Sequence, residues 1–424
     1  MSRGSFWWWP LGAMALSAGC VERADVLGPG PPPSSSTLGA GGIGGDGGRG
    51  AAGGAGGNTV DPPATNFDLV DAGTDHTCAL SDGRLYCWGG NGKGALGLGD
   101  GPPRAVPTRV GADDRWVGLA TGSRFTVALL EDGSVWGTGE NVAGQLGLGD
   151  DVGRTVLSAI AAFGPMTAVL GTREHMLALA PGGALWGWGE NAEGQLGQDD
   201  PFPGEGADRR SPVPIATERV WVHAGGFAGH SCAIDDEGAL WCWGRNSSNQ
   251  LGLGGGAAGQ LRTPQRVPGP ADWTRIVGSN PHSCGLRNDG SLWCWGDNGS
   301  RQLGLGDSVD GVDIPTRVGQ DSDWSDVSVS TFHTCGVKTT GSLWCWGRND
   351  EGQLGTADIT DRTTPTRIGD DDDWDRVSNG RFHTCATKRD GTAWCTGQNG
   401  DGQLGVGDFE RRSAFTRVLP SVAP

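Results

Sequence analysis

Short stretches in which apolar and polar residues alternate recur along the chain, separated by turn sequences. In HTCGVKTTGSLWCWG, which begins at His333, two such stretches flank residues 339–341. Glycine stands last in this loop, where a three-residue hairpin turn requires a left-handed residue. The pattern predicts a β-hairpin in which Cys335 lies directly opposite Cys345.

The same hairpin pattern recurs elsewhere with the same turn chemistry. Three further copies place a glycine-terminated loop at residues 236–238, 288–290 and 389–391. The first copy is one residue shorter, and its two-residue loop is Asp82-Gly83. Asp-Gly is a preferred two-residue hairpin turn, so loop length and turn chemistry agree and predict the strand register.

The hairpins belong to a longer repeat. The glycine that closes each QLG-like triplet falls at Gly97, Gly147, Gly197, Gly252, Gly304, Gly355 and Gly405, with spacings of 50 to 55 residues. Each unit runs from a short apolar strand through the hairpin to N-x-x-G-Q-L-G and then P-T-R-V. A period near fifty made of short strands and glycine turns is typical of a β-propeller with one blade per repeat. We predict an all-β, seven-bladed propeller over residues 66–420.

Apolar residues occupy both faces of the third strand of each unit. Trp344 and Trp346 point to one face, while Leu343 and Cys345 point to the other. A strand packed between two neighbouring blades requires this arrangement. The sixteen tryptophans after the N-terminal segment all occur at repeat positions, and each ring can bury ~150–250 Å². We expect them to dominate the core, with carbohydrate stacking as the alternative for any exposed ring.

Cysteines fill the two opposed hairpin positions in five repeats. In repeat two both are replaced together, by Val127 and Gly137, and in repeat three by Leu177 and Gly187. Directly opposed Cα atoms lie about 4.5–5.5 Å apart, which is within disulfide range. In an exported chain this parity predicts five disulfides. They are Cys78–Cys87, Cys232–Cys242, Cys284–Cys294, Cys335–Cys345 and Cys385–Cys395.

The N-terminus has the pattern of an export signal. In MSRGSFWWWPLGAMALSAGC, Arg3 precedes an apolar run and then small residues before Cys20. LSAGC resembles a bacterial lipoprotein signal, although Ser17 stands where leucine is usual. We expect residues 1–20 to be this signal and Cys20 to be lipidated, with a simply cleaved signal as the alternative.

Residues 21–65 are rich in glycine, proline and serine and contain little apolar surface to bury. Such a composition predicts a disordered tether. The expected location is therefore extracytoplasmic, with the propeller anchored by lipid to a bacterial membrane or cell surface.

The net charge and the hydropathy of the chain limit the classes of partner that we expect it to bind. The chain has 49 acidic and 32 basic residues, a net charge of −17. Such a surface repels phosphate backbones, so we expect no nucleic-acid partner. No run of eighteen apolar residues occurs, so a membrane contact would be made through the lipid alone.

Six histidines stand two residues before the first cysteine position, where repeat two has Phe125. They are His76, His175, His230, His282, His333 and His383. A metal site is one interpretation, but zinc needs about four ligands within ~2.0–2.3 Å, and equivalent atoms on different blades lie further apart. We expect structural histidines that hydrogen-bond a backbone group between blades, and we predict no metal or cofactor.

Catalytic patterns are weak. No paired carboxylates, nucleophile elbow or phosphate loop stands out, so we predict no catalytic residue and no enzyme. The acidic run from Asp370 to Asp373 could attract a cation, but such a run is usually solvated. His223, the one histidine off the repeat position, lies in an ordinary strand pattern.

Variation between repeats concentrates after the QLG triplet. It is longest at residues 198–212, QDDPFPGEGADRRSP. Exposed loops on a rigid scaffold commonly carry recognition. Phe202, Arg209 and Arg210 are therefore candidate partner contacts, with a tolerated insertion as the alternative.

The repeated unit resembles that of the regulator of chromosome condensation family. Its first copy is GTDHTCALSDGRLYCWGGNGKGALG from Gly73, and its last is GRFHTCATKRDGTAWCTGQNGDGQLG from Gly380. The resemblance implies a seven-bladed propeller whose final strand, near residues 415–418, closes the ring beside residues 67–70. The founding member exchanges guanine nucleotide on a small nuclear GTPase and binds chromatin. That activity does not carry over, because this chain has an export signal and no basic tail.

Secreted bacterial relatives, among them inhibitors that grip β-lactamases with one face of the ring, fit the expected compartment better by fold analogy. We expect a monomeric binding module or scaffold for an unknown protein partner. The alternatives are an exported enzyme acting on carbohydrate or peptide, and guanine-nucleotide exchange.

Overall fold

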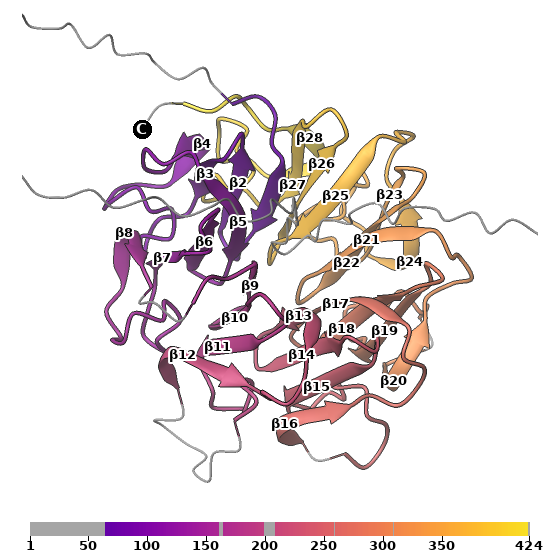
Figure 1. The fold of residues 1–424 in the computed structure, drawn as a ribbon. Coiled ribbons are helices and arrows are strands. Elements are labelled where there is room, and N and C mark those ends of the chain that lie inside the picture. Colours follow the sequence, from indigo (N-terminus) through magenta and orange to yellow (C-terminus); the bar gives the residue numbers. More distant parts are fainter. Residues whose placement is uncertain (1–63, 161–163, 199–207, 258, 308, 423–424) are drawn as a thin grey trace, which may run out of the picture.

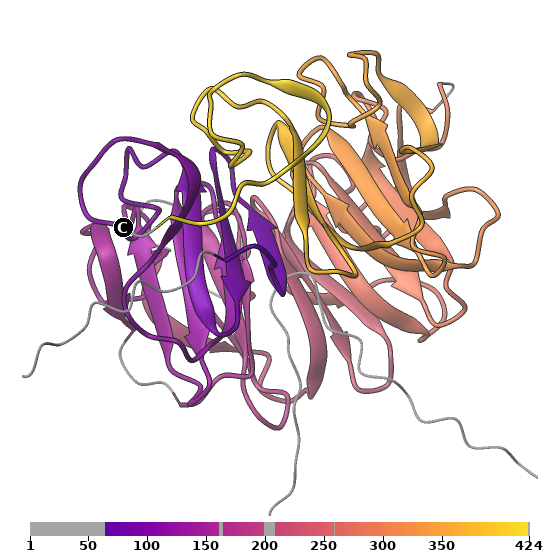
Figure 2. The same cartoon turned by 90° about the horizontal axis from the view of Figure 1, so that it is seen from above.

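The structure is a computed structural model, and it describes residues 64–160, 164–198, 208–257, 259–307 and 309–422. Within these ranges all regular structure is β-strand, with 28 strands in seven four-stranded antiparallel sheets. The sheets are arranged as blades around a central axis (Figure 1), and Figure 2 shows the same ring from the side. The predicted all-β, seven-bladed propeller is confirmed. In this part of the chain no helix is long and apolar enough to cross a membrane.

Each blade uses four consecutive strands, numbered from the axis outward. Blades 1 to 4 contain β1 (Leu69–Ala72), β2 (His76–Ser81), β3 (Arg84–Gly89), β4 (Arg104–Arg109); β5 (Trp116–Thr121), β6 (Phe125–Leu130), β7 (Val135–Gly139), β8 (Arg154–Ala159); β9 (Ala168–Gly171), β10 (His175–Leu179), β11 (Leu185–Gly189), β12 (Arg209–Ile215); β13 (Trp221–Gly226), β14 (His230–Asp235), β15 (Leu240–Arg245) and β16 (Gln260–Arg266).

Blades 5 to 7 follow the same order. They contain β17 (Trp273–Ser279), β18 (His282–Arg287), β19 (Leu292–Asp297), β20 (Gly311–Arg317); β21 (Trp324–Val329), β22 (His333–Lys338), β23 (Leu343–Gly347), β24 (Arg362–Arg367); β25 (Trp374–Asn379), β26 (His383–Lys388), β27 (Ala393–Gly397) and β28 (Arg412–Arg417).

The hairpin register agrees with the prediction. Cys335 is the Cα partner of Cys345 in the β22–β23 pair, and Gly341 closes the turn with φ of +91°. In blade 1 the turn residues Asp82 and Gly83 both have positive φ, 48° and 73°, as a type I′ hairpin requires.

The five predicted disulfides are present. Each joins the second and third strands of one blade across a Cα–Cα distance of 4.1 Å, and all ten cysteines are fully buried. In blade 2 the opposed pair is Val127 and Gly137, and in blade 3 it is Leu177 and Gly187. An apolar side chain opposite a glycine thus takes the position of the bridge.

Tryptophan rings join neighbouring blades. Five of them are 0% exposed, and each donates its indole N–H to a glutamine carbonyl of the preceding blade at 2.9–3.0 Å. That glutamine belongs to the N-x-x-G-Q-L-G motif. In the sixth repeat the Asn349 side chain accepts from the Leu354 amide at 2.9 Å, while Gly352 turns the loop with φ of +76°. The motif therefore fixes the carbonyl that the next blade uses.

The last blade closes the ring beside the first, as expected, because Val418 lies in one buried apolar cluster with Phe67 and Val70. Strand β28 stays in blade 7, paired with β27, and the first blade (indigo) lies beside the last (yellow) in Figure 1. Because every repeat supplies four strands of its own, no strand needs to be exchanged. Closure is made by the tail: Ser421 donates to the Ala64 carbonyl at 2.9 Å and accepts from the Ala64 amide at 2.7 Å. The Val422 amide donates to the Pro107 carbonyl at 2.9 Å.

Candidate functional site

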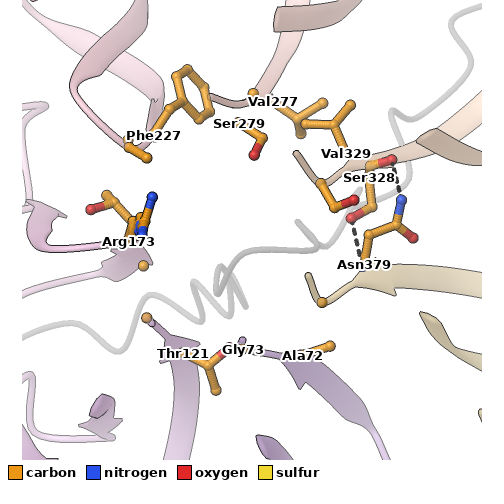
Figure 3. A pocket seen from close by; sticks show the side chains of 18 of the residues that line it. Ala72, Gly73, Thr121, Arg173, Phe227, Val277, Ser279, Ser328, Val329 and Asn379 are labelled. Carbon is orange, nitrogen blue, oxygen red and sulfur yellow. Dashed lines mark hydrogen bonds between the residues drawn. The ribbon is translucent and has the colours of Figure 1, made fainter. Parts of the chain in front are cut away.

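A cavity of about 220 Å³ lies on the propeller axis, and we call it the central pit. Residues from all seven blades line it (Figure 3). It extends along the ends of the innermost strands to the loops that lead into the second strands. We call the face of the propeller formed by these loops the channel face.

Polar side chains surround the mouth of the pit. One residue per blade stands at equivalent positions: Thr74, Ser123, Arg173, Ala228, Asn280, Thr331 and Arg381. Of the charged residues in the lining, Asp71 is committed to the scaffold. Its carboxylate accepts from the Thr121 amide and hydroxyl at 2.7 and 2.9 Å and from the Ser378 hydroxyl at 2.9 Å. Asp71 therefore joins blades 7, 1 and 2, whereas the two arginines remain at the mouth.

The wall of the pit is partly apolar. Phe227, Val277 and Val329 face the opening in Figure 3. Phe227 is packed against the His230 ring at a centroid distance of 4.6 Å, and glycine beside it makes room, since a Cβ at Gly278 would lie 2.8 Å from the phenylalanine ring. The result is a narrow opening, smaller than the ~300–1,000 Å³ of typical small-molecule sites.

An exposed aromatic pair lies on the channel face next to the pit. The Phe332 and Phe382 rings stack with centroids 5.2 Å apart and planes 15° apart, and both are partly exposed. The guanidinium of Arg381 lies 5.0 Å from the Phe382 ring, and that of Arg348 lies 5.1 Å from the Phe332 ring. We call these four residues the aromatic shelf.

The two shelf arginines differ in their charge partners. Arg348 is paired with Asp350. Arg381 forms no ion pair with any of the described residues, and its guanidinium contacts the Phe382 ring. Sequence reasoning missed the shelf, although repeats six and seven are the two that place phenylalanine directly before the repeat histidine.

The repeat histidines have an interblade structural role, as expected, but their partner differs. Each Nε2 lies 2.7–3.2 Å from a Ser or Thr hydroxyl of the next blade: His76–Thr126, His175–Ser231, His230–Ser283, His282–Thr334, His333–Thr384 and His383–Thr77. The hydroxyls donate in turn to backbone carbonyls. The expected backbone group is therefore reached through a hydroxyl.

Burial keeps five of these rings neutral. It lowers the pKa of His175, His282, His333 and His383 to about 3 and that of His230 well below its usual value. Blade 2 has no histidine, and there Phe125 packs in one apolar cluster with Met176 of blade 3. Among the described residues, no group of three His, Cys, Asp or Glu could hold a metal ion.

The acidic run from Asp370 to Asp373 lies on the opposite face of the ring, and three of its aspartates are paired with cations. Lys388 Nζ lies 2.6 Å from Asp371 and 3.0 Å from Asp373, and Asp372 pairs with Arg367 at 2.9 Å. The lysine also lies over the rings of two tryptophans, Trp374 and Trp394, at 4.9 and 5.3 Å. The run therefore binds side chains of blades 6 and 7 rather than lying fully solvated.

Two of the three predicted partner contacts, Arg209 and Arg210, lie at the rim rather than at the pit. Arg209 and Arg210 begin β12, the outer strand of blade 3. The Arg210 guanidinium lies 2.8 Å from the carboxylate of Asp151 in blade 2, and both side chains are about half exposed. Phe202 and Cys20 lie outside the described residues. His223 is buried in β13, and burial together with the charge of Arg275 lowers its pKa to about 3.

The comparisons agree with the repeat pattern and the fold. A family model described as "RCC1-like domain" matches residues 44–324, and models of the regulator of chromosome condensation (RCC1) repeat match residues 340–387, 324–353 and 375–403. The chain belongs to the RCC1-like family. RCC1-like relatives include the ultraviolet-B receptor UVR8 of Arabidopsis thaliana, 31% identical over 71% of this chain and 58% of UVR8. Human protein RCC2 is 32% identical over 32% of this chain and 26% of its own length.

Solved structures of two relatives share the propeller. Human WBSCR16 has a TM-score of 0.70 at 21% identity, covering 79% of this chain and 94% of its own. Prp20p of Saccharomyces cerevisiae has a TM-score of 0.69 at 21% identity, covering 84% of this chain and 87% of its own. This chain spans less than two thirds of the curated relatives it matches, so these likenesses establish the family and the fold.

Proposed function

We propose that this RCC1-like propeller is a protein-binding module that recognises its partner with the channel face. The observation that carries the proposal is the aromatic shelf, a partly exposed phenylalanine stack flanked by arginines beside the central pit. Aromatic and arginine side chains supply much of the energy in protein interfaces. Prp20p has the same fold, and its crystal structure was described together with its binding to Gsp1p and histones. This supports a binding role for this chain.

The distribution of apolar residues favours the channel face. The loops that join the third and fourth strands begin at this face, and several present large apolar side chains to solvent: Val142, Val152, Ile359 and Phe409, between 52% and 71% exposed. Single exposed apolar groups are common on protein surfaces, but several on one face, together with the partly exposed Phe332 and Phe382 rings, indicate an interaction surface. On the opposite face of blades 6 and 7, aspartates pair with Lys338 and Lys388.

Five buried disulfides indicate an oxidising, extracytoplasmic setting. Within that setting we propose that residues 1–20 direct export, that Cys20 carries the lipid, and that residues 21–65 tether the propeller of residues 66–420 as a monomer. Acyl chains contribute ~0.8 kcal/mol per buried methylene, enough for firm anchoring when more than one chain is attached.

The location is tested by mass spectrometry of the natively exported protein, alkylated without reduction. Five intra-blade disulfides and a lipid mass on Cys20 are expected. Ten alkylated thiols on an unprocessed chain would overturn the export and the tether together. A disulfide-bonded chain that begins at another residue would retain the compartment and overturn the lipid alone.

The binding function is tested by site-specific photo-crosslinking in the cell of origin. A photoreactive phenylalanine replaces Ile359 on the channel face, and a matched variant carries it at Val220, which is 45% exposed and lies beside the other face. One defined protein adduct from the first position and none from the second is expected. Adducts from Val220 alone would assign binding to the opposite face. If the Ile359 position gives the adduct, a variant lacking residues 199–207 tests the contribution of Phe202 to it.

A further inference from the structure

We infer that the partner presents an acidic segment to the channel face, with a carboxylate bound by Arg381 at the mouth of the central pit. A neighbouring apolar side chain of the partner would rest on the rings of Phe332 and Phe382. This inference rests on the proposed binding function and specifies the chemistry of the partner.

The charges in the pit favour an anionic group. Its charged lining consists of Asp71, Arg173 and Arg381, and Asp71 accepts three hydrogen bonds from the scaffold. Arg173 is half exposed and lies 3.6 Å from Glu174, so its charge is partly balanced. Arg381 is exposed and has no carboxylate partner among the described residues. A carboxylate from outside is the complementary group.

The other residues of the aromatic shelf position the Arg381 side chain for a contact with a carboxylate. The guanidinium lies over the Phe382 ring, Phe382 stacks on Phe332, and Arg348 closes the stack from the other ring. A guanidinium that lies over a ring can still direct N–H groups away from that ring, where they can donate to a carboxylate in pairs. The side chain therefore loses less conformational freedom on binding than a solvated arginine would.

Two lysines of this chain show the contacts made by a cation that stabilises the fold. On the opposite face, Lys338 and Lys388 also lie over aromatic rings, but each is neutralised by two aspartates at 2.6–3.1 Å. Their side chains are 10% exposed. Arg381 repeats the cation-over-ring contact without the carboxylates, and it faces solvent. We infer a partner from this difference, because Arg381 has no carboxylate to pair with among the described residues.

The size of the pit favours a side chain on a protein over a separate small molecule. About 220 Å³ is below the usual range of small-molecule sites, and the surrounding loops present the exposed apolar residues expected of a broad protein contact. Asn280 and Thr331 at the mouth are neutral polar groups that can donate to the remaining carboxylate oxygen.

The inference is tested with labelled short peptides and fluorescence anisotropy at low ionic strength. The probe has a central phenylalanine flanked by glutamates, and its control has glutamines in their place. We expect the glutamate peptide to bind about fivefold more tightly, a ratio that corresponds to one exposed charge-assisted contact. Equal affinities of the two peptides would overturn the inference.

Two variants locate the contact. Arg381→Gln should remove the preference for glutamate, while Arg389→Gln, an exposed arginine on the opposite face, should retain it. Preference retained in the Arg381→Gln variant would overturn the role of Arg381. A separate Phe332→Leu variant should weaken both peptides alike and leave their ratio near fivefold, because it alters the apolar contact while Arg381 keeps its place over the Phe382 ring.

The peptide result and the crosslinking result can fail separately. A channel-face adduct whose formation is unaffected by Arg381→Gln leaves the binding function standing and overturns the acidic partner. Glutamate-dependent peptide binding without any protein adduct supports the anionic site and counts against the proposed function. Equal binding by a free dicarboxylic acid would reassign the site to a small molecule.

Discussion

Acidification to pH 6 should destabilise the propeller strongly, because buried imidazoles must stay neutral for it to fold. Burial lowers the pKa of six histidines: His175, His223, His230, His282, His333 and His383. In the unfolded chain each returns to a pKa of about 6.5. The unfolded state therefore binds more protons than the folded state below this value, so stability falls as the pH falls.

The magnitude follows from the unfolded pKa alone, provided that the folded values lie well below 6. At pH 6 an unfolded imidazole is about three-quarters protonated, which stabilises the unfolded chain by about 0.8 kcal/mol for each histidine. Six such groups contribute about 5 kcal/mol, a large part of the ~5–15 kcal/mol total stability of ordinary proteins. Aspartates such as Asp358, whose hydrogen bond from Arg362 lowers its pKa to about 2, titrate outside this window.

One carboxyl group works in the opposite direction. Burial, together with the charges of Glu174, Asp208 and Glu193, raises the pKa of Glu190 to about 7. The folded state then takes up a proton that the unfolded state does not, so this group gains stability between pH 7 and pH 6. Because Glu190 is only partly buried, solvent screening reduces its effect, and the histidines outweigh it. Glu190→Gln should make the acid sensitivity larger.

The assay is urea unfolding followed by tryptophan fluorescence at pH 7.5, 7.0, 6.5 and 6.0. The decisive variant is His383→Phe with Thr77→Met, which copies the natural Phe125–Met176 pair of blades 2 and 3. Gly380 leaves space in front of residue 383 as Gly122 does in front of Phe125, so the larger ring can be accommodated. The Gln403 carbonyl keeps its bond from Trp88.

The variant should lose about 0.8 kcal/mol less stability than the wild-type protein between pH 7.5 and pH 6. Only the pH difference is compared, so a change in stability common to all pH values does not affect the result. An unchanged pH dependence in the variant, or a wild-type protein equally stable at pH 7.5 and pH 6, would refute the reasoning.

Three further changes test the scaffold by urea unfolding. Cys335→Val with Cys345→Gly, the pair type of blade 2, should lower the free energy of unfolding by a little under ~3 kcal/mol, because the bridge closes a short loop; a negligible loss would contradict this. Lys388→Met keeps the stem on the rings but removes two ion pairs, so a loss of about 1 kcal/mol that disappears at high salt is expected. Gly341→Ala should cost about 2 kcal/mol or more, since φ is +91° and the new Cβ would lie 2.3 Å from the Asp372 carbonyl oxygen; an alanine variant as stable as wild type would exclude that strain.

The fold could be predicted from sequence because local turn chemistry and repeat spacing agree. The loop ending in Gly341 sets which residues of the hairpin face each other, and the cysteine pairs report the same register independently. The ring closure could not be predicted in detail. Ser421 and Val422 lie after the last repeat and have no counterpart in other blades, so periodicity gives no information on their partners.

The histidine partners could have been found in the sequence. Where a repeat has histidine, the next repeat has Ser or Thr one position after its own equivalent residue, and where repeat two has Phe125, repeat three has Met176. The residues are about fifty positions apart, so a comparison within one repeat does not reveal the pairing. The shelf was missed for a similar reason, since Phe332 and Phe382 meet only when two blades are placed side by side.

The residue directly before each repeat histidine can differ in chemical type between blades without affecting the packing of the core. The residue after the histidine contacts the neighbouring blade, and in five blades the next one forms a disulfide, so changes there affect packing. The preceding residue lies on the channel face and differs widely between blades: Asp75, Arg124, Glu174, Gly229, Pro281, Phe332 and Phe382. Because each is held by a rigid strand start, its side chain is presented at a fixed place around the pit. The recognition that we propose for the channel face would depend on this ring of single residues, and exchanging them should alter partner choice while the stability of the blades is retained.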